Sequence, residues 1–278
     1  MVTNLDDYIF SDVGFEDLTT SLQSDDEFYD KYVTLKIYTR ERLILSGVLM
    51  ALDIAKKFNC EVLKIGKNSD IFMPKDEIFS IKGRYFDIHK AWKLIQVLFE
   101  YSCKISTYTY DMVSQIKKAN ANCALLTTRK TFPFSKELCV QAVLSGGGNI
   151  HRFGLFDSVL FFDNHIKFYK NFNEFCEKIK IFKIKMPEKK IMVECGDFDD
   201  FKLLLSYDPD VIQCDKFSLK QLQDCLSLRD KSHKNINITA SGGINLDNCF
   251  DYAKIGIDGI VTSAPYTQGV VNLGCEII

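Results

Sequence analysis

The second half of the chain alternates short apolar runs with longer stretches of helical character, and this rhythm constrains the fold more than any other feature. Six such runs recur between positions 124 and 262. In order along the chain they read ALLTT, SVLFF, KIMVEC, VIQC, INITA and GIVT. Short apolar strands separated by helices are typical of a parallel sheet that helices cover. We therefore predict an α/β fold in which residues 111–267 form a parallel β/α barrel.

Polar or charged side chains follow these runs at the points where the predicted strands end. They are Arg129 and Lys130, Asn164 and His165, Glu194, Asp215, Ser241 to Gly243, and Ser263. The carboxyl ends of the strands of a β/α barrel meet at one rim, where active sites lie. The strand pattern alone therefore predicts that these residues converge, although they are far apart in sequence.

The first part of the chain follows another pattern. Residues 33–39 alternate as a strand does, residues 46–57 have helical spacing, and residues 89–110 are typical of a long helix. We predict an N-terminal α/β sandwich domain over residues 1–110, with the C-terminal tail 268–278 returning to it.

Several rim residues are suited to anions. Arg129 and Lys130 are adjacent cations, and the pair His151-Arg152 follows a glycine triplet at 146–148. Ser241-Gly242-Gly243 precedes a predicted helix, where backbone N–H groups and the helix dipole favour a phosphate. Single features have simpler explanations, such as a basic turn, a capping glycine or a core histidine. The density of such features between residues 127 and 165, within one βα unit, favours an anion site.

Composition excludes several classes of function. Lys+Arg of 35 against Asp+Glu of 37 leave a formal net charge of −2, which is unlike a nucleic-acid or membrane-surface binder. The 10 cysteines contain no Cys-x-x-Cys pair and resemble neither a zinc ribbon nor a disulfide scaffold. The N-terminal segment is acidic and no apolar run reaches membrane-spanning length. We therefore expect a soluble cytoplasmic protein.

A long, ordered set of motifs resembles the quinolinate phosphoribosyltransferase family, whose members are also called nicotinate-nucleotide pyrophosphorylases. The motifs are, in chain order, TRKTFP, GGGNIHRFGLFDSVL, DNH, VEC, CDKFS and ASGGI. A further motif, VTSAPY, taken with TRKTFP and DNH, is similar to the ModD-type pyrophosphorylases, homologues associated with molybdenum transport. The resemblance covers nearly the whole chain.

This resemblance implies an enzyme that transfers phosphoribose from phosphoribosyl pyrophosphate to a nitrogen heterocycle and releases pyrophosphate, with Mg²⁺ as cofactor. It implies a sandwich packed on an incomplete barrel of about six strands, in a homodimer or hexamer. The implied catalytic residues are Lys130, Glu194 and Asp215, of which Glu194 and Asp215 also hold the metal. The substrate-binding residues that we expect are Arg129, His151, Arg152, Phe162, His165, Ser241, Gly242, Gly243 and Ser263, of which Phe162 is a departure from the family. Alternatively, Glu194 and Asp215 are partners of Arg129 or Lys130 in ion pairs.

The sequence departs from the family where quinolinate would bind. Phe162 stands where the family motif LIKDNH has its lysine, and Trp92, with Lys93 beside it, stands where an arginine serves the partner subunit. Since an unpaired buried carboxylate costs several kcal/mol, the loss of two cations disfavours a dianionic acceptor. We expect a less acidic, more aromatic acceptor that lies against Phe162.

Three other interpretations stay open at this point. The chain could be a divergent quinolinate phosphoribosyltransferase that makes nicotinate mononucleotide for NAD biosynthesis, with Lys93 replacing the missing arginine. It could be a non-catalytic binder of an oxyanion such as molybdate, or of a nucleotide, which would have no use for Glu194 and Asp215 facing its ligand. It could also be a barrel aldolase or isomerase that uses Lys130, although the neighbouring Arg129 supports this poorly.

Overall fold

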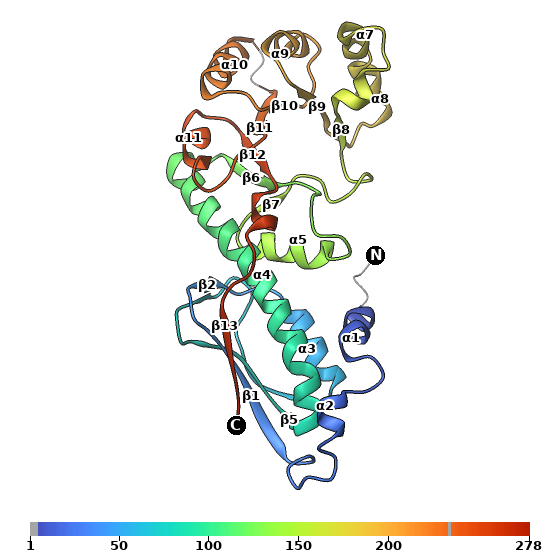
Figure 1. The fold of residues 1–278 in the computed structure, drawn as a ribbon. Coiled ribbons are helices and arrows are strands. Elements are labelled where there is room, and N and C mark those ends of the chain that lie inside the picture. The colour runs from blue at the N-terminus through green and yellow to red at the C-terminus, as the bar shows by residue number, and fades with distance from the viewer. Residues whose placement is uncertain (1–4, 233–234) are drawn as a thin grey trace. The chain divides into compact units, whose positions relative to one another are not determined.

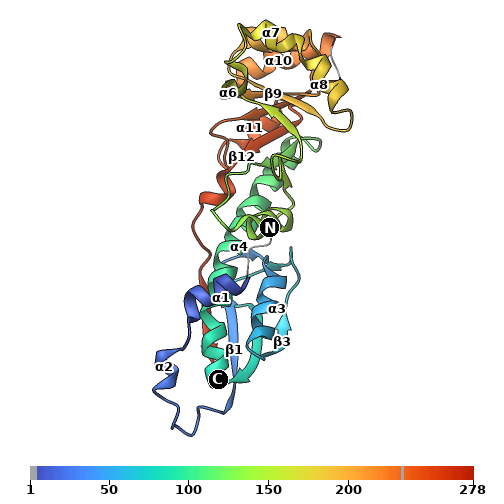
Figure 2. The same cartoon turned by 90° about the vertical axis from the view of Figure 1, so that its right-hand side faces the viewer.

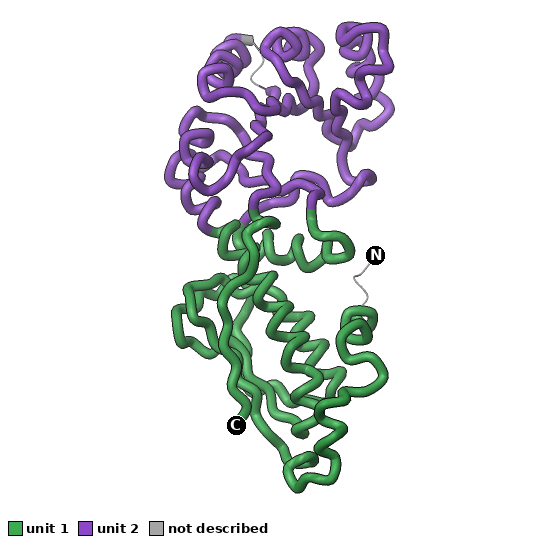
Figure 3. The backbone as a smooth tube through the Cα atoms, in the orientation of Figure 1, with its two compact units in different colours: residues 1–110, 131–147, 265–278 green, residues 111–130, 148–264 purple. Residues whose placement is uncertain are grey.

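The computed structural model describes residues 5–232 and 235–278, which form two compact units (Figure 3). Unit 1 comprises residues 1–110, 131–147 and 265–278, and unit 2 comprises residues 111–130 and 148–264. By its contacts, the segment 131–147 thus belongs to unit 1. The division of the chain into domains at residues 110 and 267, which we made from the sequence, stays a prediction.

Unit 1 is built on a four-stranded antiparallel sheet of strand order β13-β1-β5-β3. The strands are β1 (Tyr32–Thr39), β3 (Glu61–Ile65), β5 (Glu77–Arg84) and β13 (Leu273–Ile277), with a separate pair of β2 (Leu43–Ile44) and β4 (Ile71–Phe72). The helices are α1 (Leu5–Val13), α2 (Leu18–Ser21), α3 (Val48–Lys57), α4 (Tyr85–Ala119), whose last nine residues belong to unit 2, and α5 (Lys136–Ser145). No helix among the described residues is both long and apolar enough to cross a membrane.

One hydrophobic core holds unit 1 together, and Figures 1 and 2 show the helices that lie beside its sheet. Leu35 and Ile37 alternate along β1 on one face of the sheet and are fully buried, as the period of two requires. Ile54 of α3 and Phe99 of α4 belong to the same cluster of buried side chains. Two helices therefore cover one face of the sheet, which is the sandwich architecture that the sequence predicts.

Unit 2 is a curved sheet of parallel strands in the order β7-β6-β12-β11-β10-β9-β8. Its strands are β6 (Ala124–Thr127), β7 (Asn149–Ile150), β8 (Val159–Phe161), β9 (Ile191–Cys195), β10 (Val211–Asp215), β11 (Asn237–Ser241) and β12 (Gly259–Thr262). The sheet has seven strands rather than about six. The additional strand is β7, whose two residues are too short to produce an apolar pattern.

Helices lie along the outer side of this sheet (Figure 1). They are α7 (Phe172–Glu177), α8 (Ile179–Lys185), α9 (Phe198–Leu205), α10 (Leu219–Ser232) and α11 (Cys249–Lys254). The short helix α6 (Asp163–Ile166) follows β8, and the 3₁₀ turn η1 (Ala264–Thr267) follows β12. On the other side, Leu160, Met192 and Val211 form a small apolar cluster at paired positions of β8, β9 and β10, and Phe162 packs on it. The next residues on that side, two positions further along each strand, include Glu194 and Gln213.

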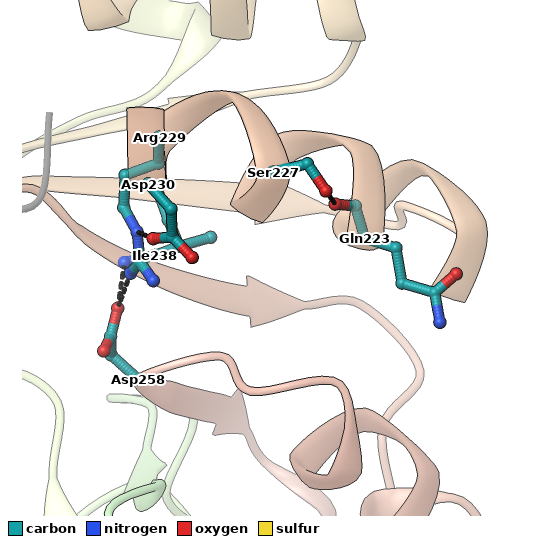
Figure 4. Close-up of polar contacts among 6 residues, drawn as sticks. All are labelled: Gln223, Ser227, Arg229, Asp230, Ile238 and Asp258. Carbon is teal, nitrogen blue, oxygen red and sulfur yellow. Dashed lines mark hydrogen bonds and ion pairs between the residues drawn. The ribbon is translucent and has the colours of Figure 1, made fainter. Parts of the chain in front are cut away.

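An ion pair secures the amino ends of two strands (Figure 4). Asp258, just before β12, accepts a hydrogen bond of 2.6 Å from Nη1 of Arg229 on α10 and one of 2.7 Å from the backbone N–H of Ile238 on β11. Nε of Arg229 also donates to Asp230 at 2.9 Å. Contacts at the amino ends of barrel strands serve stability rather than chemistry.

Candidate active site

The carboxyl ends of the strands of unit 2 are level, so the residues predicted for the site lie along one edge of the sheet. Asp215 pairs in register with Ser241, and Thr262 pairs with Thr127. The edge carries Arg129 and Lys130 after β6, His151 and Arg152 after β7, Phe162 and His165 after β8, Glu194 in β9, Asp215 at the end of β10, Ser241 to Gly243 at the end of β11, and Ser263 after β12. We call this edge the rim.

Two carboxylates on neighbouring strands form the centre of the rim. Oε2 of Glu194 accepts a hydrogen bond of 2.6 Å from Nε2 of Gln213, and Oδ1 of Asp215 accepts one of 2.8 Å from Oγ of Ser241. Burial raises the pKa of Glu194, and the charge of Asp215 raises it further, while Gln213 and two lysines oppose the shift. A carboxylate whose pKa rises because of a second carboxylate is suited to share a cation or ligand hydroxyls.

The lysines that act on Glu194 are Lys130 and Lys216. Lys216 was not among the predicted residues, although it directly follows Asp215 in the CDKFS motif. Its backbone has a left-handed φ of 60°, and its N–H donates to the carbonyl of Ser241 at 2.8 Å. This link ties the ends of β10 and β11 together, so Lys216 belongs to the rim as much as Asp215 does.

The Ser241-Gly242-Gly243 loop needs its glycines. Gly242 has φ +91°, and a Cβ there would lie 2.5 Å from Cγ of Lys216 and 3.0 Å from Oδ1 of Asp215. Gly243 also has a positive φ, of +72°, and an added Cβ there would meet nothing within 4 Å. Among the residues that the structure covers, neither glycine N–H donates to another group, so both are available to an anion.

The helix expected directly after this loop begins later. α11 starts at Cys249, because a turn rich in asparagine intervenes. Asn245 N–H donates to Oδ1 of Asn248 at 2.9 Å, and Nδ2 of Asn248 donates to the carbonyl of Gly243 at 3.1 Å. Such local side-chain bonds compete with helix formation. The expectation that a helix begins directly after the loop is therefore wrong, and phosphate binding by Ser241, Gly242 and Gly243 stays a prediction.

Arg152 is the most buried cation of the rim, with 6% of its surface exposed. Burial lowers the pKa of its guanidinium and the charge of Arg129 lowers it further. No carboxylate of the described chain lies within ion-pair distance of it; its carbon Cζ lies instead 5.6 Å from the ring centroid of Phe162. A buried arginine without a carboxylate partner is a ready receptor for an anionic ligand group.

His151 differs from the charged residue that the sequence suggests. Burial, with the charge of Arg152 adding to it, lowers the pKa of His151 to about 4. His151 is therefore neutral near pH 7, and its contribution to ligand binding would be a hydrogen bond rather than a positive charge.

Phe162 and His165 are linked to each other and to Arg152. The backbone N–H of Phe162 donates to Nδ1 of His165 at 3.1 Å, and the two rings are stacked, with centroids 5.9 Å apart and planes 23° from parallel. When Nδ1 accepts, the neutral ring carries its proton on Nε2. Arg152, Phe162 and His165 thus form one side of the rim, which combines two stacked rings with one guanidinium.

Two predicted positions have little support from contacts. Ser263 directly follows β12 and makes no hydrogen bond to another predicted residue among those described. Trp92 lies in unit 1, where the ammonium of Lys93 is 4.5 Å from its ring centroid. The described residues also contain no group of three or more His, Cys, Asp or Glu side chains arranged for a metal. Glu194 and Asp215 would therefore hold a metal ion only together with ligand oxygens or water.

A parallel half-barrel with a glycine loop and paired carboxylates at its rim, in a chain that also has an antiparallel sandwich unit, is the architecture of a class of phosphoribosyltransferase. Comparison with known proteins identifies the family. The N-terminal domain of the quinolinate phosphoribosyl transferases matches residues 17–103, and their C-terminal domain matches residues 105–273. The chain belongs to the quinolinate phosphoribosyltransferase family and is a phosphoribosyltransferase of the nicotinate-nucleotide pyrophosphorylase type, a pentosyltransferase.

Individual relatives agree with this assignment. The protein named "Putative pyrophosphorylase ModD" of Pasteurella multocida is 33% identical over 94% of this chain and 92% of its own length. The "Probable nicotinate-nucleotide pyrophosphorylase [carboxylating]" of Methanothermobacter thermautotrophicus is 28% identical over 100% of this chain and 99% of its own. The solved nicotinate-nucleotide pyrophosphorylase of Francisella tularensis has the same fold, with a TM-score of 0.88, 24% identity, and coverage of 99% of this chain and 94% of that one.

Proposed function

We propose that the rim of unit 2 binds phosphoribosyl pyrophosphate and transfers its phosphoribosyl group to a ring nitrogen of a heterocyclic acceptor. In this reaction the nitrogen lone pair forms a bond to C1′ of the ribose, and the bond from C1′ to the pyrophosphate oxygen breaks. The observation that carries the proposal is the pair Glu194 and Asp215 on adjacent strands, next to the free amides of Gly242 and Gly243 and the charges of Lys130 and Lys216.

Each part of the donor has a complementary group. The amides of Gly242 and Gly243 suit the 5-phosphate, because two free N–H groups on a glycine loop allow close approach of an anion. Arg129 and Lys130 suit the pyrophosphate. Glu194 and Asp215 suit the ribose hydroxyls, and they are also the residues that would hold Mg²⁺. When bound, Mg²⁺ neutralises charge on the leaving pyrophosphate.

The chain's own residues would act mainly by position and charge. The transition state of such a transfer carries positive charge on the ribose ring, so two carboxylates beneath it stabilise that charge. Lys130 would stabilise negative charge on the leaving oxygen. Because Ser241 donates to Asp215, that carboxylate is already oriented before ligands bind.

The acceptor side favours a ligand that is less acidic than a pyridine dicarboxylate. Arg152 offers one buried guanidinium for one carboxylate, His151 is neutral, and Phe162 presents an apolar ring where a second cation would be needed. A flat heterocycle could lie against Phe162 while one acidic group pairs with Arg152. The family's own dianionic acceptor, quinolinate, is the second candidate. The whole-length similarity to a carboxylating nicotinate-nucleotide pyrophosphorylase supports it.

Binding of the donor tests the proposal first. Isothermal calorimetry of the purified protein with phosphoribosyl pyrophosphate and Mg²⁺ should show one site, and inorganic molybdate should not compete for it. Absence of donor binding would refute the transferase and favour a simple oxyanion binder.

Pyrophosphate release then identifies the acceptor. The protein would be incubated with the donor, Mg²⁺ and either quinolinate or a panel of heterocyclic monocarboxylates. Turnover of quinolinate to nicotinate mononucleotide would place the protein in NAD biosynthesis. Turnover of a monocarboxylate alone would show that the acceptor pocket has been reassigned.

We also propose a homodimer that can assemble into a hexamer, in the cytoplasm. The dimer rests on the family and on the frequency of two-fold assemblies. Phe15 and Leu22, near α1 and α2, are 99% and 89% exposed, which suits a surface that another subunit covers. All ten cysteines are free thiols and nine of them are buried, as expected for a reducing compartment.

A further inference from the structure

Gln213 lies directly beside Glu194, and the proposed chemistry does not use it. The two residues are paired in register on β10 and β9, and Nε2 of Gln213 donates to Oε2 of Glu194 at 2.6 Å. Gln213 is 3% exposed and occupies the layer of the half-barrel just above the apolar cluster of Leu160, Met192 and Val211. It is thus a buried polar residue, with the polar residues Glu194 and Thr239 as its neighbours in register and the apolar cluster one layer below.

The other end of the same amide is unsatisfied. Oε1 of Gln213 is buried and has no hydrogen-bond partner among the described residues, and the same holds for Oγ1 of Thr239, its neighbour in register on β11. Burying an amide oxygen without a partner costs free energy that an apolar residue of the same length would not cost. Packing alone therefore does not explain a glutamine at this position, whereas its contact with Glu194 does.

The contact has a definite consequence for Glu194. One carboxylate oxygen, Oε2, is taken by Gln213, while Oε1 has no partner in the described part of the chain. The charge of Asp215 nearby would otherwise repel this carboxylate toward other rotamers. Since Gln213 is itself fixed by burial, its N–H group selects one orientation of Glu194.

We propose that Gln213 is a positioning residue, which holds Oε2 of Glu194 so that Oε1 is presented to the phosphoribosyl donor. This inference rests on the proposed function and adds a residue to it. Gln213 does not touch the substrate; it acts only through Glu194. Its effect should therefore disappear when the carboxylate of Glu194 is removed.

A double-mutant cycle tests this dependence. Calorimetry with phosphoribosyl pyrophosphate and Mg²⁺ would compare the wild type, Gln213→Met, Glu194→Ala and the double variant. Methionine keeps the length and burial of glutamine but has no N–H donor. We expect Gln213→Met to weaken donor binding about ten-fold, which is typical of a lost hydrogen bond to a charged group. In the Glu194→Ala background the same change should alter binding less than about two-fold.

Thr239→Val is the matched control. Thr239 lies in the same layer, is 5% exposed and also has an unpartnered oxygen, but has no contact with Glu194. Donor affinity should be unchanged in this variant. Thermal unfolding of each variant checks that the fold is kept, and Gln213→Leu provides a second apolar replacement if methionine destabilises the sheet.

The outcomes separate this inference from the function on which it rests. Wild-type affinity in Gln213→Met would overturn the inference, as would an equal loss with and without the carboxylate of Glu194. Failure of the wild type to bind the donor would instead refute the proposed function, and the inference with it.

Discussion

At the scale of single residues, the acceptor side of the rim depends on Phe162. Its ring lies beside the buried guanidinium of Arg152 and stacks on His165. The acceptor side that we propose would therefore offer a flat apolar surface and one buried cation. Which ligand it accepts depends on the balance between these two features.

Replacing Phe162 by lysine should shift this balance toward dianions. A second cation near Arg152 can pair with a second carboxylate, and charge-assisted hydrogen bonds of this kind contribute about 1.5–3 kcal/mol. We expect Phe162→Lys to bind quinolinate about ten-fold or more tightly than the wild type in calorimetry. Phe168→Lys is the control, because Phe168 is 83% exposed and outside the rim. Equal affinities of Phe162→Lys and wild type would contradict the role given to Phe162.

His151 makes a pH-dependent contribution to stability. Its pKa is lowered from 6.5 to about 4 in the folded protein, so the unfolded chain binds the proton more readily. The contribution is present above pH 6.5 and is lost as the pH falls from 6.5 to about 4. It amounts to at most about 3 kcal/mol.

Urea unfolding between pH 4 and 7 measures this effect. Wild-type stability should fall more steeply toward low pH than that of His151→Asn, which lacks the titrating ring. Because His89 also has a pKa lowered by burial, the comparison between the two proteins isolates the part due to His151. Parallel curves for both proteins would show that His151 is not buried as described.

At the scale of elements, the loop after β11 depends on the backbone of Gly242. A side chain there meets both Lys216 and Asp215, whose positions fix the carboxyl end of β10. The end of β10 therefore packs so closely on this loop that position 242 has no room for a side chain.

Gly242→Ala should weaken donor binding by more than about ten-fold, because the added Cβ displaces Lys216 and Asp215 and strains a left-handed backbone by about 1–3 kcal/mol. Gly256→Ala is the matched control. Gly256 also has a positive φ, of +102°, but nothing lies within 4 Å of an added Cβ. Both variants should lose stability in thermal unfolding, and only Gly242→Ala should lose affinity for the donor in calorimetry.

The opposite end of the sheet can be tested separately. Arg229→Met removes the partner of Asp258, and since the Arg229 side chain is 12% exposed, we expect a loss of about 1–2 kcal/mol in urea unfolding. Donor affinity should be unchanged, because the amino ends of the strands are remote from the rim. Lys220→Met, which breaks the exposed pair with Asp224 on the same helix, should cost less than about 0.5 kcal/mol.

At the scale of the whole molecule, assembly can be measured directly. Light scattering coupled to size exclusion should give the mass of a dimer or hexamer of the 31.9 kDa chain. Phe15→Glu with Leu22→Glu should shift the protein toward monomer, because charges on an apolar interface are costly to bury. A monomeric wild type would refute the proposed assembly.

Much of unit 2 could be predicted from sequence. Six of the seven strands appear as apolar runs, and the polar residues after them all lie at the rim. This works because the carboxyl ends of parallel strands must lie on the same edge, whatever the details of packing. The order of residues along the chain was therefore enough to place Glu194 and Asp215 near each other.

Only the tertiary structure decided how deeply these residues are buried, which charge they carry and which groups they contact. The burial that makes His151 neutral and the placement of Arg152 over Phe162 depend on how the chain folds. So do the hydrogen bond from Gln213 to Glu194 and the effect of the Lys216 charge on the pKa of Glu194. The start of α11 after an asparagine turn likewise depends on competing local hydrogen bonds that periodicity does not show. The sequence by itself determined which strand each polar residue of the rim follows, and that all of them lie at the same edge of the sheet. Their charge states and partners depend on desolvation and register, which exist only once the sheet has formed.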